Sequence, residues 1–228
     1  MKLSNETITI LKNFSQINSG MLFKAGSILS TVSGQRTILA KANIKENIPK
    51  DFGIFDLNNF LSVLSLFKDG AELSFDEKNV IFNNKNSSIQ YRFASEEMIY
   101  DEKNRELINA GKVPPVNKDV SFVLTQEDFE WLLKTANVLA SPNISVESDG
   151  NSVKLVCCDV KNDSCNKHYM DLPDVDCGGK SFSLVFKSET LKIIPKTYNV
   201  DISFSGISKF TDADDILTYW IALEAKNV

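Results

Sequence analysis

The sequence predicts an α+β protein that contains one structural unit twice. The first observation is the stretch from Asp56 to Phe75, in which an apolar helix, a tight turn and an alternating strand follow one another. The second is the return of that pattern from Phe186 to Phe204, where AELSF of the first copy aligns with VDISF of the second after a two-residue gap. The third is the length, because 228 residues suit two domains of about 110 residues each.

Helical periodicity opens the first copy over residues 4–17. The apolar side chains that recur there along one side are those of Ile8, Leu11, Phe14 and Ile17. Gly20 is expected to end this helix. Strand-like runs follow near residues 21–24, 28–32 and 37–43, with a turn at Ser33-Gly34.

The central helix of the first copy is predicted over residues 56–67. Asp56 is a good N-cap, because its carboxylate can accept hydrogen bonds from the free N–H groups of the first turn. The apolar face of this helix consists of Leu57, Phe60, Leu61 and Leu64. A turn at residues 68–70 then leads into strands near residues 71–75, 80–83 and 89–93.

The second copy repeats this order. Thr125 and Asp128 resemble a capping box that opens a helix. The side chains on its apolar face are those of Phe129, Leu132, Leu133 and Ala136. The hairpin over residues 33–44 aligns without a gap with residues 149–160, and a second helix is expected over residues 187–194, before Pro195. Strands near residues 200–204, 207–211 and 216–224 close the copy.

The two copies predict an N-terminal domain over residues 1–112, which includes the start of a connector, and a C-terminal domain over residues 113–228. The connector, residues 95–120, is polar and contains Gly111 and Pro114-Pro115. Residues 1–112 carry 14 basic and 13 acidic side chains, whereas residues 113–228 carry 11 and 17. Such units leave sheet edges open, and head-to-tail pairing of unlike domains closes into a ring if the rotation per subunit allows it.

Composition and the N-terminal residues predict where in the cell the protein is located. No window approaches the ~18 apolar residues of a membrane span. The N-terminus MKLSNETITI lacks the charged and apolar regions of a signal peptide. A cytosolic location with reduced cysteines follows by default. The net charge of −5 argues against binding of nucleic acid by the whole surface.

The sequence predicts no catalytic site, no metal site and no cofactor. His168 is the only histidine, so no Ser-His-Asp or Cys-His arrangement exists without it, and no phosphate-binding loop is present. Asp212, Asp214 and Asp215 are expected in a solvated turn, with a metal-dependent nuclease site as the alternative. The side chains that could supply tetrahedral zinc ligands are those of Cys157, Cys158, Cys165, Cys177 and His168. Their spacing includes no Cys-x2-Cys pair, which favours buried or idle thiols over zinc.

Lysines on the predicted helices form the candidate binding site for DNA. Lys12, Lys134, Lys187 and Lys192 stand among few acids, and Lys2 and Lys196 flank these helices. Attraction to phosphates requires positive charge but no geometry for reading bases. The alternative for each single lysine is an ordinary solvated helix face.

Three segments of the chain resemble the sliding clamps of T-even-type bacteriophages, which are DNA polymerase processivity factors. These segments are residues 1–26, residues 56–66 and the closing run YWIALEA, and the likeness extends from end to end of the chain. The resemblance implies two processivity-fold domains per chain, a homotrimeric ring with pseudo-sixfold symmetry, and helices that line a central hole. It also implies double-stranded DNA, the replicative polymerase, an ATP-driven clamp loader and late transcription factors as partners.

We therefore expect a sliding clamp that encircles duplex DNA and tethers a polymerase in the cytoplasm of the infected host cell. The resemblance further implies that the pocket for polymerase and loader peptides lies near the connector, without singling out its residues. One alternative is a duplicated structural or assembly protein of the virion that does not encircle DNA. Another is an enzyme with an unrecognised site. The mass in solution, with and without DNA, separates a discrete trimer from a virion protein that assembles further.

Overall fold

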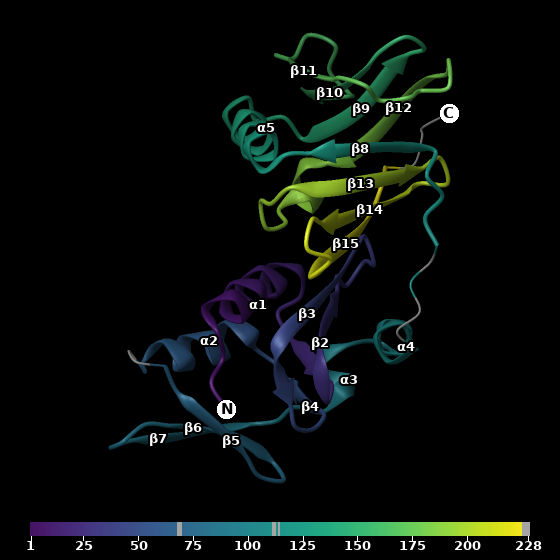
Figure 1. Ribbon diagram of the computed structural model, residues 1–228. Coiled ribbons are helices and arrows are strands. Elements are labelled where there is room, and N and C mark those ends of the chain that lie inside the picture. Colours follow the sequence, from purple (N-terminus) through teal and green to yellow (C-terminus); the bar gives the residue numbers. More distant parts are fainter. Residues whose placement is uncertain (68–69, 111–112, 114, 225–228) are drawn as a thin grey trace. The chain divides into compact units, whose positions relative to one another are not determined.

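The computed structural model of the chain describes residues 1–67, 70–110, 113 and 115–224 (Figure 1). The chain divides into two compact units, residues 1–113 (unit 1) and residues 114–228 (unit 2). The predicted turn residues Lys68 and Asp69 lie outside the described residues. Within those residues, no helix is long and apolar enough to cross a membrane.

Unit 1 combines helices with small antiparallel sheets. Its elements are α1 (Asn5–Ile17), β1 (Met21–Phe23), β2 (Gly26–Val32), β3 (Ile38–Ile48), β4 (Phe52–Ile54), α2 (Leu57–Ser65), β5 (Glu72–Phe75), β6 (Asn79–Asn83), β7 (Ser88–Arg92), α3 (Glu96–Ile99) and α4 (Glu102–Ala110). Strand β1 pairs with β4, β2 pairs with β3, and β6 lies between β5 and β7. The predicted order of helix, hairpin, helix and three strands is thus confirmed.

The core of unit 1 lies between the two helices and the strands they cover. All four predicted apolar residues of α2 are buried. The Phe60 ring meets the rings of Phe82 and Tyr91 edge-on, at centroid distances of 5.0 and 5.7 Å. In α1 the predicted Leu11 and Phe14 are buried, whereas Ile8 and Ile17 are only half-buried. The buried face is displaced around the helix from the predicted one and consists of Thr7, Ile10, Leu11, Phe14 and Ser15.

The helix starts follow the predicted capping chemistry. The Asp56 carboxylate accepts a hydrogen bond from the backbone N–H of Asn59 at 2.9 Å. The Thr125 hydroxyl accepts from the backbone N–H of Asp128 at 3.1 Å and donates to its carboxylate at 2.6 Å. Both predicted caps are therefore confirmed, and each satisfies an N–H group that the first helical turn leaves free.

Unit 2 repeats the architecture with longer strands. Its elements are β8 (Val120–Leu124), α5 (Gln126–Val138), β9 (Asn143–Asp149), β10 (Val153–Cys158), β11 (His168–Leu172), β12 (Ser181–Lys187), the 3-10 helix η1 (Ser188–Leu191), β13 (Tyr198–Ser203), β14 (Ile207–Asp212) and β15 (Leu217–Ala222). One sheet has the order β11-β10-β9-β12, and β15, β14, β13 and β8 follow one another in the other. The hairpin β9–β10 corresponds to β2–β3, as the gapless alignment predicts.

Aromatic side chains fill the core of unit 2 beneath α5. Phe129, Leu132 and Ala136 are buried as predicted, whereas Leu133 is half-buried. The Phe129 ring meets Tyr198 edge-on at 6.0 Å. The Tyr198 hydroxyl donates to the carbonyl of Ile194 at 2.6 Å, which satisfies the one polar group of a ring that is otherwise fully buried.

The helix predicted over residues 187–194 is wrong in length and type. Lys187 ends strand β12, and only Ser188–Leu191 forms a single 3-10 turn, with Lys192 as its C-cap. A turn this short cannot continue, because Pro195 disfavours helical geometry in the residue before it. Leu191 and Ile193 are buried nevertheless, so the apolar pattern reflects burial without a regular helix.

The connector was predicted as a linker but contains helices α3 and α4. Tyr100 and Ile108 are buried and join Leu22 and Val32 in one apolar cluster, which fixes this segment to unit 1. Just before α3, the backbone of Ala94 donates to the carbonyl of Gly53 at 2.9 Å. A Cβ atom on Gly53 would lie 2.5 Å from the carbonyl oxygen of Ala94, so only glycine allows this close approach.

A second misread segment is the polar run around His168, which was predicted as a loop. His168–Leu172 forms strand β11, which pairs with β10 in antiparallel register from Cys157 opposite His168 to Val153 opposite Leu172. Its burial alternates regularly, with Tyr169 and Asp171 exposed and their neighbours half-buried, but the polar residues before it give only a weak strand signal in the sequence. Pairing with a regular neighbouring strand overrides that weak local signal.

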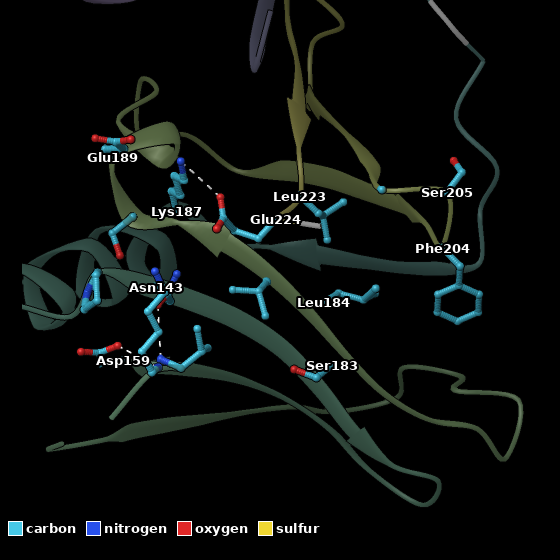
Figure 2. Close-up of a pocket in the computed structure, with 16 residues that line it drawn as sticks. Asn143, Asp159, Ser183, Leu184, Lys187, Glu189, Phe204, Ser205, Leu223 and Glu224 are labelled. Atoms are coloured by element: carbon cyan, nitrogen blue, oxygen red, sulfur yellow. Dashed lines mark hydrogen bonds and ion pairs between the residues drawn. The ribbon is translucent and has the colours of Figure 1, made fainter. Parts of the chain in front are cut away.

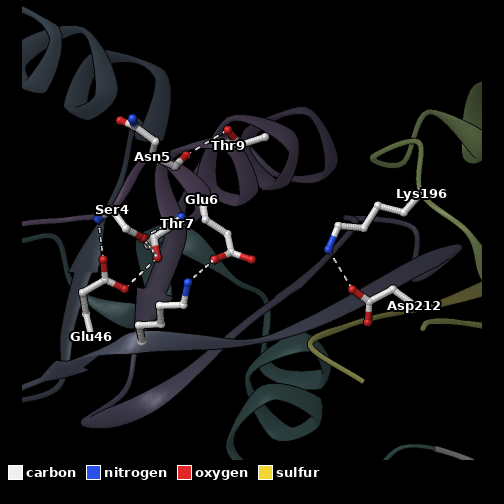
Figure 3. A network of polar contacts seen from close by, with 9 residues as sticks. Ser4, Asn5, Glu6, Thr7, Thr9, Glu46, Lys196 and Asp212 are labelled. Carbon is white, nitrogen blue, oxygen red and sulfur yellow. Dashed lines mark hydrogen bonds and ion pairs between the residues drawn. The ribbon is translucent and has the colours of Figure 1, made fainter. Parts of the chain in front are cut away.

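The start of α1 is anchored to strand β3 by the carboxylate of Glu46 (Figure 3). This carboxylate accepts hydrogen bonds from the backbone N–H of Ser4 and, at 2.7 Å, from the Thr7 hydroxyl. Beside it, Lys45 lies 3.0 Å from Glu6 of α1. Partial burial disfavours the charged carboxylate, but the hydrogen bonds outweigh it, so the pKa of Glu46 lies below its ordinary value of 4.5.

Replacing Glu46 by Gln should weaken the anchoring of α1 and reduce the acid sensitivity of unit 1. A carboxyl group whose pKa is lowered on folding stabilises the fold above its unfolded value, near 4.5, and this stabilisation is lost as the pH falls through the lowered pKa. Urea unfolding between pH 7 and pH 3 measures both effects. Glu72→Gln, on an exposed position of β5, is the matched control, and an equal acid response in the two variants would contradict the anchoring role.

Candidate functional site

The exposed faces of α1 and α2 are polar but carry little charge. On α1 the exposed residues Asn5, Thr9, Lys12 and Gln16 fall at i, i+4, i+7 and i+11, which places them in one stripe. The solvent side of α2 carries asparagine and serine residues and no charged residue within Leu57–Ser65. The two helices lie side by side in unit 1 (Figure 1). Together they form a mostly neutral surface rich in hydrogen-bonding groups.

The exposed face of α5 differs from the expectation of few acids around Lys134. Glu127, Asp128 and Glu130 are exposed on the same helix, so acidic groups outnumber the single lysine. An apolar pair is also exposed there, since 55% of Trp131 and 74% of Val138 remain accessible. The helix therefore offers an aromatic surface beside Lys134 more than a basic one.

Four of the six candidate lysines stand in solvent. Lys2 and Lys12 are exposed in unit 1, at the N-terminal segment and on α1. Lys134 and Lys192 are exposed in unit 2, on α5 and directly after η1. These positions suit contacts with phosphate groups, because the charge needs only access and no fixed geometry.

Lys187 and Lys196 are half-buried, and each forms an ion pair within unit 2. The Lys187 ammonium lies 3.4 Å from the Glu224 carboxylate. The Lys196 ammonium lies 2.8 Å from the Asp212 carboxylate, and Figure 3 shows this pair. Neither partner was foreseeable from the local sequence, because Asp212 and Glu224 follow their lysines by many residues.

The solvated turn predicted for the three aspartates is wrong for Asp212, which is only 2% exposed. Its carboxylate accepts hydrogen bonds from the backbone N–H groups of Ile216 and Leu217 at 2.8 and 2.9 Å, in addition to the ion pair with Lys196. These contacts fix the turn between β14 and β15. Asp214 and Asp215 are exposed in that turn.

The cysteines are distributed over separate environments. Cys157 is buried and donates weakly to the carbonyl of Leu132, and burial raises the pKa of its thiol to about 11. Cys158, also buried, lies 3.9 Å from the Ser145 hydroxyl. Cys165 accepts a hydrogen bond from the backbone N–H of Asp159 at 3.2 Å. Among the described residues, no group of three or more His, Cys, Asp or Glu side chains is placed to hold a metal ion.

Each unit has an edge strand whose position could not be predicted from the sequence. In unit 1, β7 ends the sheet β5-β6-β7, and its Arg92 side chain is exposed. In unit 2, β11 ends the sheet β11-β10-β9-β12, and its Tyr169 and Asp171 side chains are exposed. An edge strand leaves backbone donors and acceptors without strand partners, which makes it a template for another strand.

A groove of about 450 Å³ lies where the connector packs on unit 1. Its apolar lining comes from β1, β2, β3 and the connector, and includes Leu22, Ile28, Leu39, Leu107, Ile108 and Val113. Ile28 is 43% exposed, so the groove is open to a ligand. The connector is braced on one side by the ion pair between Arg105 and Glu97 at 2.9 Å. We refer to these residues as the connector groove.

Comparison with known sequences gives full-length relatives. Residues 3–100 match the family described as DNA polymerase processivity factor. The chain is 33% identical over 232 residues to the sliding clamp of Vibrio phage KVP40, with 99% of this chain and 100% of that protein covered. It is 29% identical over 235 residues to the sliding clamp of Enterobacteria phage T4, with 99% and 97% covered.

Comparison with solved structures gives the same fold at much lower identity. The A. fulgidus PCNA, solved with the C-terminal region of FEN-1 bound, has a TM-score of 0.70 at 11% identity and covers 100% of this chain and 98% of that one. The Helicobacter pylori beta clamp, solved in complex with 3,4-difluorobenzamide, has a TM-score of 0.70 at 15% identity and covers 100% and 66%. The predicted α+β clamp fold is thereby confirmed.

Proposed function

Because the chain belongs to the sliding clamp family of DNA polymerase processivity factors, we propose that it encircles duplex DNA as a homotrimer and tethers the replicative polymerase of a bacteriophage. The observation that carries this proposal is the likeness to phage clamps over the whole chain. The family serves processivity rather than catalysis. A tethered polymerase re-engages the primer end at high effective concentration, which replaces slow bimolecular rebinding.

Each unit then acts as one clamp domain, with α1, α2 and α5 facing the DNA. We assign the phosphate contacts mainly to Lys2, Lys12, Lys134 and Lys192, which are exposed, and give Lys187 and Lys196 a smaller part because both are half-buried. The mostly neutral α1 and α2 faces and the acidic α5 face supply little net attraction. Retention on DNA must therefore come from closure of the ring.

The two free edges support a head-to-tail ring. Strand β7 of one subunit would pair with β11 of the next, so that Arg92 meets the acidic Asp171. Each contact between subunits then joins unit 1 of one copy to unit 2 of the next. The ring closes when three copies are joined in this way. Exposed charge pairs contribute only ~0–1 kcal/mol each, so strand pairing and apolar packing supply most of the stability.

The connector groove is the proposed docking site for the polymerase and the clamp loader. It is apolar, partly exposed and built from the connector, and a clamp of the same fold binds the C-terminal region of a partner protein. Late transcription factors are further proposed partners, and the proposed location is the cytoplasm of the infected host cell. A duplicated virion protein that does not encircle DNA is the rival function, which the following experiments distinguish.

The loaded protein should survive a high-salt wash on covalently closed circular DNA and leave after the circle is cut. Binding through phosphate contacts alone weakens with a logarithmic slope of about −0.9 per neutralised phosphate. A threaded ring escapes that rule, because it must open or slide off an end. Retention is measured by gel filtration of clamp loaded on circular and linearised DNA. Equal loss from both forms at high salt would rule out encirclement.

The same assay tests the proposed phosphate contacts. Replacing Lys12, Lys134 and Lys192 together by Glu should impair loading while the trimer mass stays unchanged. The control replaces Lys85, Lys103 and Lys161, three exposed lysines outside the proposed set, by Glu. An equal defect in the control would show that total charge matters, and the assigned positions would be wrong.

Arg92→Glu should weaken the trimer, because it places like charges at each proposed contact. Adding Asp171→Arg in the same chain should restore it. Light scattering over a dilution series measures the mass, and Lys85→Glu, in the turn between β6 and β7, is the matched control. A trimer indifferent to Arg92→Glu, or a two-fold dimer of the unchanged protein, would contradict the proposed pairing of edges.

Ile28→Glu should lower the affinity of the connector groove for a synthetic peptide that copies the C-terminal end of the cognate polymerase. We expect a loss of at least about tenfold, or about 1.4 kcal/mol, because the charged side chain replaces an apolar contact. Val123→Glu, at an apolar position of β8 that is 58% exposed against 43% for Ile28, is the control. Isothermal titration gives both values, and equal affinities for the two variants would place the peptide elsewhere.

A further inference from the structure

Cys158 and Cys165 stand at the two ends of the turn that connects β10 to β11. Cys158 is the last residue of β10, and Cys165 precedes β11, which begins at His168. Cys157 donates weakly to the carbonyl of Leu132 on α5. Because neighbouring side chains of a strand point to opposite faces, Cys158 faces away from α5, toward the outer side of the sheet.

The loop of residues 159–167, which we call the β10–β11 loop, folds back on the end of β10. The sulfur of Cys165 accepts a hydrogen bond from the backbone N–H of Asp159 at 3.2 Å, and its thiol lies 3.7 Å from the carbonyl oxygen of the same residue. The backbone N–H of Val160 donates to the side-chain oxygen of Asn143 on β9 at 3.3 Å, a contact that Figure 2 shows. These bonds hold Cys165 against the end of β10.

The contact with Asp159 places the Cys165 sulfur close to Cys158. The nitrogen of Asp159 is two covalent bonds from the Cα atom of Cys158, and these bonds measure about 1.3 and about 1.5 Å. With the 3.2 Å contact, the Cys165 sulfur therefore lies within roughly 6 Å of that Cα atom. Burial raises the pKa of the Cys158 thiol, and the charge of Cys165 raises this pKa further, which agrees with two thiols that lie close together.

A disulfide between these two residues needs only local movement. Bonding of the sulfurs at about 2 Å requires rotation of both side chains and a small shift of the loop. The loop is exposed over residues 160–164, so its tip can shift without disturbing the core.

The other two thiols are placed differently. Cys157 is buried on the opposite face, beneath α5. Cys177 lies in the turn between β11 and β12, at the far end of the sheet, because β11 runs antiparallel to β10 from His168 opposite Cys157 to Leu172 opposite Val153. Both are therefore internal controls for a reaction at the β10–β11 loop.

We propose that Cys158 and Cys165 form a reversible disulfide by exchange with glutathione disulfide, with Cys158 as the resolving thiol. Cys165 is half-buried and Cys158 is only 4% exposed, so the Cys165 thiolate reacts first. It attacks one sulfur of glutathione disulfide, which forms a mixed disulfide and releases one glutathione thiolate. The Cys158 thiol then gives up its proton and attacks the Cys165 sulfur, which breaks the mixed disulfide and releases the second glutathione. One glutathione disulfide is reduced to two thiols, which take up the two protons that the cysteines lose.

The exchange keeps the edge of β11 free of bulky adducts. Left in place, glutathione on Cys165 would add a charged tripeptide just before that strand, whose edge forms the proposed contact between subunits. The internal disulfide removes the tripeptide and closes only the short β10–β11 loop. This protective role rests on the proposed ring, whereas the exchange itself is a property of unit 2.

Intact-mass spectrometry of the folded full chain tests the exchange. Every protein carries Cys177→Ser, so that the half-buried Cys177 thiol does not react. With glutathione disulfide in native buffer, this chain should lose two hydrogen atoms, and peptide mapping should find Cys158 joined to Cys165. Dithiothreitol should restore both thiols. An unchanged mass, retained glutathione without a bridge, a bridge to Cys157, or a bridge that forms only in urea would overturn the proposal.

Further substitutions in the same background assign the two roles. Cys158→Ala should trap one glutathione on Cys165, because no resolving thiol remains, and its absence would contradict the proposed order of attack. Cys165→Ser should reduce the modification at least tenfold, since the remaining thiols are buried. Cys157→Ala, at the buried cysteine on the opposite face, is the matched control and should leave the bridge intact, while circular dichroism checks that each variant is folded. The reaction needs neither DNA nor a ring, so its failure leaves the clamp function untouched, and a failed clamp assay leaves the exchange untouched.

Discussion

Backbone hydrogen bonding at strand edges is the constraint on which the functions assigned to this chain depend. The backbone N–H and C=O groups of a strand need hydrogen-bond partners on both sides or access to solvent. Each open sheet has two edge strands, so a protein built from several small sheets has many edges. Here β7 and β11 end their sheets, and β12 is covered only at one end by Leu223–Glu224. The proposed ring contact follows from how the edges of β7 and β11 are satisfied.

Sequence patterns predicted the repeated units because apolar periodicity and caps are local signals. The buried face of α2 and the Asp56 cap follow from neighbouring residues alone. The errors arise where distant residues decide the outcome. Helices α3 and α4 form around Tyr100 and Ile108, whose partners Leu22 and Val32 lie far back in the chain. Lys187 and Lys196 matched a basic helix face, yet each carboxylate that pairs with them comes from another strand or from the C-terminal segment.

The charge distribution indicates that electrostatic attraction to DNA is weak, so the proposed retention on DNA requires another cause. A surface that binds DNA through phosphates alone concentrates Lys and Arg, whereas α2 carries no charge and α5 carries more acids than bases. Weak attraction has a use in a moving tether, because each strong phosphate contact would have to break at every step. In the proposed ring, exposed lysines would guide entry of the duplex, and closure of the polypeptide around it would supply the lifetime.

The accessibility of Trp131 gives the protein an intrinsic optical probe. Indole emission shifts to longer wavelength in water and is quenched by collision with small solutes, so a side chain that is 55% exposed dominates both responses. Trp220, by contrast, is half-buried beneath the ammonium of Lys209. Iodide quenching of the unlabelled protein therefore reports on what approaches α5, so the proposed entry of a duplex beside that helix can be measured without attaching a dye.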